Sequence, residues 1–276
     1  MTRKQTHKTK PPDTALADDD VEALREACRH LEHPSLAARL SSAVGTPIDV
    51  ALSLLPKQWY GKLHRVAEIS IAKAYATALL GMRDAHQMSA HETYFKGLVA
   101  TSGFMGGLFG LPGLVIELPV TTTLMLRSIA EIARDHGEDA NTDETRAACL
   151  EVFALGGRTE IDDAADTGYY GVRLALSSYL SFASLHASQR HLSGEGIPAL
   201  VRLIQAVSAR FGAQLSTRAA ARLVPVLGAA GAATINVIFM QHFQDVARGH
   251  FTVRRLERRY GADLVQGHYE RIAGTL

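Results

Sequence analysis

A run of twenty uncharged residues, 97–116, constrains the fold more than any other feature, because six of its positions are glycine. A helix of this length would span roughly 30 Å, the thickness of the hydrocarbon core of a bilayer. Each glycine costs a helix about 1 kcal/mol relative to alanine, and Pro112 lacks a backbone donor. We therefore expect a break at GLPG, residues 110–113, between two apolar helices that form a hairpin.

The glycines of the first arm recur at intervals of four, which predicts a surface without side chains that another backbone can approach closely. The second arm is expected to continue toward Arg134, with a new helix beginning near Pro119. The expected counterpart is a second helix that begins with the small residues 228–233. The predicted packing positions are Gly103, Gly106, Gly107, Gly110, Pro112, Gly113, Pro119, Gly228 and Gly231.

Apolar residues recur at intervals of three and four through the rest of the chain, which predicts an all-α multi-helix bundle. The further expected helices are 57–80, 141–156, 163–190, 197–212, 216–225, 229–259 and 262–273. Residues 1–17 are rich in charge and predict a disordered tail. No Pro- or Ser-rich linker divides residues 18–276, so we expect a single helical domain there.

Composition and motifs argue against several classes of function. The 29 basic and 28 acidic residues nearly cancel, so no overall field favours nucleic acid. The glycine run lacks the lysine and Ser/Thr of a phosphate loop, which argues against a nucleotide. The twelve histidines form no zinc spacing, so no metal or cofactor is expected, and the two cysteines match no metal or redox spacing.

Three polar residues near the apolar runs are candidate site residues. Glu117 is the one charge between Gly97 and Leu126. It is interpreted either as an anion at a helix N-terminus or as a buried carboxylate with a raised pKa, suited to proton transfer, cation binding or headgroup contact. Asn236 needs partners for its amide if it is buried. Arg127 lies on the polar face of the helix that follows Pro119.

A cluster of arginines near the C-terminus predicts a basic helix surface. Such a surface could bind anionic lipid headgroups, or it could be an ordinary solvated face. Its members are Arg248, Arg254, Arg255, Arg258 and Arg259.

The order of these motifs resembles the EcsC protein family of bacteria. The resemblance rests on the glycine-rich run, the Glu117-Leu118-Pro119 sequence and GYYGVRLAL at 168–176, over roughly residues 60–265. Glu117 stands where the family more often has aspartate. The resemblance implies a mainly helical protein on the cytoplasmic side of the inner membrane, sometimes linked to transporters, and it supplies no catalytic residues.

The apolar runs have three interpretations: the core of a soluble protein, a hairpin that inserts into or lies on a membrane, and a constitutive transmembrane protein. Our leading hypothesis is a non-enzymatic helical protein that engages membrane lipid or a membrane protein through its glycine-rich helices. The alternatives are a hydrolase that uses Glu117 in a cleft between helices and a soluble protein-interaction scaffold. The sequence leaves the oligomeric state open.

Overall fold

In the computed structural model, the described part of the chain is helical and contains no strand. It comprises residues 15–32, 36–81, 92–107, 109–139, 141–156, 168–177, 196–224 and 228–276. Its helices are α1 (Asp18–Glu32), α2 (Leu36–Val44), α3 (Ile48–Ser53), α4 (Lys57–Gly81), α5 (Glu92–Gly107), α6 (Gly110–Asp135), α7 (Asp143–Leu155), α10 (Gly196–Ala221), α11 (Gly228–Tyr260) and α12 (Ala262–Ala273). Residues 169–177 are also helical. The prediction of an all-α bundle is confirmed.

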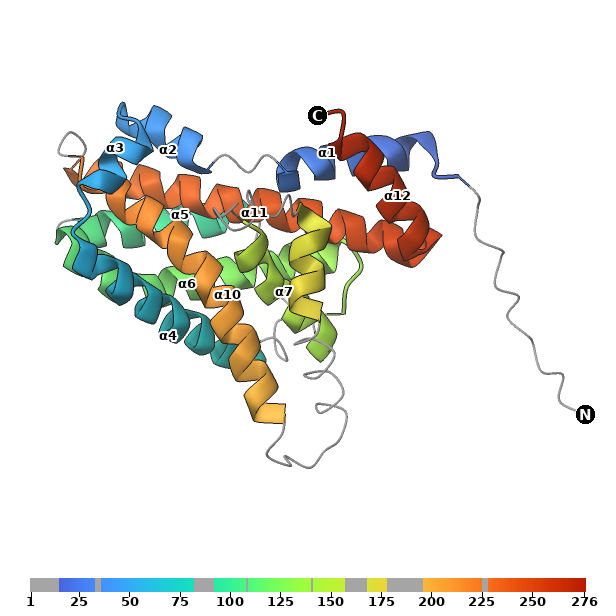
Figure 1. Ribbon diagram of the computed structural model, residues 1–276. Helices are drawn as coiled ribbons and strands as arrows, with labels where there is room; N and C mark the ends of the chain where they lie inside the picture. Colours follow the sequence, from blue (N-terminus) through green and yellow to red (C-terminus); the bar gives the residue numbers. More distant parts are fainter. Residues whose placement is uncertain are drawn as a thin grey trace, which may run out of the picture.

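Helix α11 is the axis of the bundle. Figure 1 shows it running the length of the molecule, with α2 and α3 near its beginning and α1 and α12 near its end. Helix α5 packs along it more extensively than any other described pair of helices packs together. Phenylalanines from α7, α10 and α11 form the centre of the core, with the rings of Phe153 and Phe211 4.9 Å apart and those of Phe239 and Phe243 5.1 Å apart.

The hairpin consists of α5 and α6, but its break lies earlier than we expected. Helix α5 ends at Gly107 and α6 begins at Gly110, whose φ of 61° turns the chain. Pro112 lies in the first turn of α6, where a backbone N–H has no helical partner and proline costs little, and the N–H of Gly113 donates to the Phe109 carbonyl at 3.4 Å. The new helix expected near Pro119 is wrong, because α6 continues through this residue and is held together by its packing on α4, α5 and α11.

Two further expectations need correction. The separate helices expected at 197–212 and 216–225 are one helix, α10, because the hydroxyls of Ser216 and Thr217 donate to carbonyls four residues earlier and leave the helix intact. Residues 16 and 17, which we expected in a disordered tail, pack on the bundle: Leu16 is buried, and the backbone N–H of Ala17 donates to the Tyr260 hydroxyl at 3.4 Å. Residues 1–14, and most of the helix expected at 163–190, lie outside the described residues.

Candidate functional site

Four polar side chains meet beneath the hairpin and form what we call the hairpin cluster: Glu117, Arg218, Arg222 and Asn236. Glu117 lies on α6, Arg218 in the last turn of α10, Arg222 just after α10, and Asn236 on α11. The cluster joins α6 to α10 and α11, and its side chains are almost fully buried.

Every polar atom of the Glu117 carboxylate and of the Asn236 amide is used. Arg218 Nη2 donates to Glu117 Oε1 and to Asn236 Oδ1, and Arg222 Nη2 donates to Glu117 Oε2 at 2.7 Å and to Asn236 Oδ1 at 2.8 Å. Asn236 Nδ2 donates to Glu117 Oε1 at 2.6 Å and to the carbonyl of Val99 on α5 at 2.9 Å. The amide of Asn236 is therefore a bridge that ties α5 to the cluster.

Gly103 makes room for this bridge. A Cβ atom at this position would lie 2.3 Å from Asn236 Nδ2 and 2.9 Å from the carbonyl oxygen of Ala232. Only glycine therefore allows α5 to lie this close to α11 while the Asn236 side chain occupies the interface.

The other predicted packing positions lie in different surroundings. Gly110 is exposed, with open space where its Cβ would be, so it is not part of a helix-packing groove. Gly113 and Gly231 are buried, Pro119 is partly buried and Pro112 is exposed. The surroundings of Gly106, Gly107 and Gly228 lie outside what the structure describes.

Glu117 remains ionised despite its burial. Burial would raise the pKa of its carboxyl group, but the charges of Arg218 and Arg222, with hydrogen bonds from Arg222 and Asn236, outweigh burial and lower that pKa. The expectation of a raised pKa is therefore wrong. A general acid or base works best with a pKa near the working pH, so this arrangement gives Glu117 no support as a catalyst.

The two guanidinium groups bring more charge and more donors than the cluster can neutralise. Each uses only Nη2 in the bonds above, and Nε and Nη1 of both Arg218 and Arg222 are buried without a hydrogen-bond partner among the described residues. Burial lowers the pKa of Arg218 to about 10, although Glu117 opposes this shift. Two cations thus face one anion in a site that water hardly reaches.

Sequence reasoning missed Arg218 and Arg222. Their spacing of four places both on one face of a helix, and the apolar run 223–240 follows directly, apart from its polar Thr234 and Asn236. Two arginines directly before an apolar run of this length were a signal that their side chains would be buried with it.

An exposed apolar stripe lies on the outer side of α6. Phe109, Ile116 and Val120 expose 67%, 77% and 55% of their surface, and the spacing of the last two places them on one helix face. Arg127, seven residues beyond Val120, is exposed on the same face and contacts no carboxylate among the described residues. We call Phe109, Ile116 and Val120 the hairpin stripe.

Among the described residues, α6 is the one helix long and apolar enough to cross a bilayer. Within its most apolar window, 61% of the residues are buried in the protein. A core helix of a soluble protein passes the same test of length and composition. The notable feature of α6 is therefore that the uncovered residues before Arg127 are uncharged and include Ile116 and Val120.

Each of the five C-terminal arginines, predicted to form either a lipid-binding basic surface or an ordinary solvated face, contacts a carboxylate. Arg248 pairs with Glu92 and Asp245, Arg254 with Glu138 and Glu144, Arg255 with Asp20, Arg258 with Glu138, and Arg259 with Asp20.

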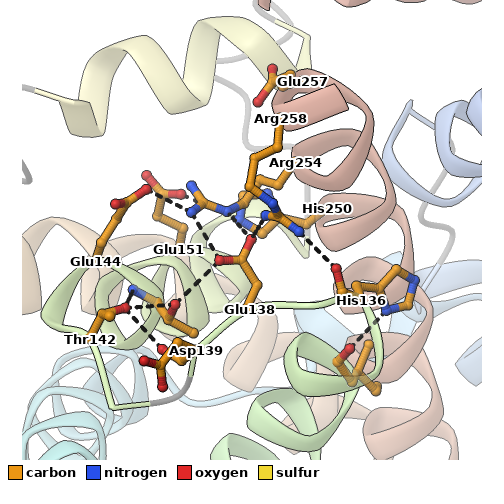
Figure 2. Close-up of polar contacts among 12 residues, drawn as sticks. His136, Glu138, Asp139, Thr142, Glu144, Glu151, His250, Arg254, Glu257 and Arg258 are labelled. Atoms are coloured by element: carbon orange, nitrogen blue, oxygen red, sulfur yellow. Dashed lines mark hydrogen bonds and ion pairs between the residues drawn. The ribbon is translucent and has the colours of Figure 1, made fainter. Parts of the chain in front are cut away.

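Figure 2 shows Glu138 between Arg254 and Arg258, and we call these three residues the rim cluster. Arg254 Nε donates to Glu138 Oε1 at 2.8 Å, and Arg258 Nη2 donates to the carbonyl of His136 at 2.7 Å. The side chain of Arg258 is 42% exposed. Arg258 is therefore open to solvent, and Arg254 has a second carboxylate partner, Glu144.

The fold and these sites define an all-helical bundle in which a buried ion cluster joins an apolar hairpin to α10 and α11. The model of the EcsC protein family matches residues 72–256, more than half of the chain and all of the hairpin cluster. The chain therefore belongs to the EcsC protein family, and the resemblance seen in the sequence is confirmed. No curated protein and no solved structure matches it.

Proposed function

We propose that this chain is a non-enzymatic membrane-associating protein whose α5–α6 hairpin contacts lipid through the hairpin stripe. The observation that carries the proposal is the exposure of Ile116 and Val120 on a helix that is otherwise mostly buried, and of Phe109 directly before that helix. Contiguous apolar side chains on the outside of a protein are typical of interaction sites. Burying one such side chain in an apolar phase contributes about 1.5 to 3 kcal/mol.

Charge favours lipid as the occupant of this surface. Residues 97–116 carry no charge, and on α6 the first exposed charge beyond the stripe is Arg127. An apolar face bordered by a cation suits a membrane interface, where the apolar side chains enter the acyl region and the cation meets anionic headgroups. The hairpin cluster would hold α6 in place while its outer face is in lipid.

Vesicle flotation tests this proposal. The purified protein should float with vesicles of phosphatidylcholine and phosphatidylglycerol, and the double variant Ile116→Ser with Val120→Ser should weaken binding at least about tenfold. Leu174→Ser is the matched control, because Leu174 is 75% exposed on a different helical segment, 169–177. It should float like the wild type.

Two results would overturn the proposal. One is a wild-type protein that stays unbound with anionic vesicles present. The other is a dimer in size-exclusion chromatography that the double variant abolishes while vesicle binding is absent, because the stripe would then join two copies of the chain.

A further inference from the structure

Most of the guanidinium nitrogens of Arg218 and Arg222 lack acceptors. Nε and Nη1 of Arg218 and Arg222 are four buried nitrogens without a partner among the described residues. Leaving a buried donor unpaired is costly, and the cost is higher for a charged group. Buried unpaired groups of this kind in a folded protein need an explanation, and a bound ion is one of the established ones.

The two guanidinium groups also lie against each other. Nη2 of Arg218 and Nη2 of Arg222 both donate to Asn236 Oδ1, so two like charges share one acceptor. Glu117 neutralises one of these charges, and the other acids of the described chain form no ion pair with either arginine. One positive charge is left over.

We propose that Arg218 and Arg222 form a binding site for a phosphate group. A phosphate supplies negative charge and several acceptor oxygens at once, and arginine forks match its geometry. A carboxylate would offer two oxygens to four unpartnered nitrogens, whereas a phosphate offers at least one more. Arg222 follows the last residue of α10, so the side chain nearest the helix end is the one that can move to admit the group.

This inference goes beyond lipid contact by the hairpin stripe, because dissolved phosphate could fill the same site. Isothermal titration with inorganic phosphate, at constant ionic strength in chloride, measures binding without a membrane. The wild type should bind, and Arg222→Gln should weaken the Kd at least about tenfold. Arg222→Lys, which keeps the charge but loses the fork, should weaken it less.

Two further variants keep the test independent of stability. Glu117→Gln raises the charge of the cluster by one, so phosphate should bind more tightly to the folded fraction of this variant. Arg258→Gln in the rim cluster is the matched control and should bind phosphate like the wild type. Absence of binding by the wild type, or equal weakening by Arg222→Gln and Arg258→Gln, would overturn the site.

Vesicles distinguish the two sources of phosphate. If a headgroup is the source, phosphatidylglycerol vesicles should bind wild type better than Arg222→Gln, and dissolved phosphate should compete. If free phosphate is the source, both proteins should bind vesicles equally while titration still separates them. The stripe variant of Ile116 and Val120 should leave phosphate titration unchanged in either case.

Discussion

The hairpin cluster and the rim cluster each combine one buried glutamate with two arginines, but they differ in how far solvent reaches the arginines. Each contains one glutamate from α6 or the turn after it and two arginines spaced by four, Arg218 and Arg222 or Arg254 and Arg258. In the rim cluster, Arg258 reaches water and Arg254 has a second carboxylate. In the hairpin cluster both guanidinium groups are buried with a single carboxylate. We expect that burial of the arginines, and not the set of residues, determines how strongly each glutamate stabilises the fold.

The largest expected effect separates the two glutamates. Glu117→Gln leaves two buried cations without an anion, so it should lower the free energy of unfolding by about 3 to 5 kcal/mol. Glu138→Gln leaves Arg258 half-exposed and Arg254 still paired with Glu144, so it should cost less, about 1 to 2 kcal/mol. Urea denaturation followed by circular dichroism measures the free energy of unfolding of both variants. Equal losses would show that the two glutamates stabilise the fold equally.

A second prediction addresses the close approach of α5 to α11. Gly103→Ala places a Cβ against Asn236 and the Ala232 carbonyl, and should cost about 1 to 3 kcal/mol by overpacking. Gly97→Ala on the same helix meets nothing within 4 Å, so it should stabilise the protein by up to about 1 kcal/mol. Thermal melts of the two variants check this, and a neutral Gly103→Ala would show that Asn236 does not need the space.

Two buried glutamates, Glu117 and Glu151, have pKa values that are shifted in opposite directions. The carboxylate of Glu151 on α7 lies 3.5 Å from His250 Nε2. The other ring nitrogen of His250, Nδ1, forms a hydrogen bond of 2.9 Å with the Tyr169 hydroxyl. Burial raises the pKa of Glu151 to about 7, although Arg173 and Arg254 oppose this shift. The pKa of Glu117 is lowered instead, because Arg218 and Arg222 contact its carboxylate directly.

The pH dependence of the free energy of unfolding follows from the directions of these two pKa shifts. A carboxyl group with a raised pKa binds more protons in the folded state, so its contribution is present below pH 4.5 and is lost as the pH rises to about 7. The stability of Glu151→Gln relative to wild type should therefore improve between pH 5 and pH 8 by on the order of 2 kcal/mol. The lowered pKa of Glu117 has the opposite effect: its ionised carboxylate stabilises the folded protein above pH 4.5, and this stabilisation is lost as the pH falls below 4.5.

The effect of His250 titration on stability must be distinguished from that of Glu151. Burial lowers the pKa of its imidazole well below 6.5, with Arg173 and Arg254 acting in the same direction, so its contribution is lost as the pH falls below 6.5. Chemical denaturation at pH 5, 6, 7 and 8 should show the difference between wild type and Glu151→Gln growing toward high pH. A constant difference would mean that Glu151 is ionised in the folded protein throughout.

The smallest expected effect is at the rim. Arg258→Gln removes one half-exposed cation, while Arg254 still pairs with Glu138 and the Thr145 hydroxyl still donates to it at 3.3 Å. We expect a loss of about 0.5 kcal/mol or less in urea denaturation. A loss as large as that of Glu117→Gln would show that the rim cluster is not screened by water.

Periodicity predicted the helical class because apolar spacing is local, and it placed α12 at its observed bounds, 262–273. It was wrong at Pro119 because tertiary packing holds α6 together across a residue that breaks isolated helices. The sequence drew attention to Glu117 and Asn236 as polar residues in apolar surroundings. It did not link them to Arg218 and Arg222, because that contact spans more than a hundred residues along the chain from Glu117 to Arg222.

The basic helix shows the reverse error. Arg254 and Arg258 looked like a free charged face because their acidic partners lie on distant segments, with Glu138 116 residues away from Arg254. Local charge patterns reveal the composition of one helix and say nothing about which side chains a neighbouring helix brings. The same limit hid the excess charge at Arg218 and Arg222.

A pair of double-mutant cycles tests most directly whether burial distinguishes the two clusters. The coupling energy between Glu117 and Arg222, from the two single Gln variants and the double variant, should be about 2 kcal/mol or more. The coupling energy between Glu138 and Arg258 should stay below about 1 kcal/mol. Equal coupling energies, or a weaker one beneath the hairpin, would contradict the account.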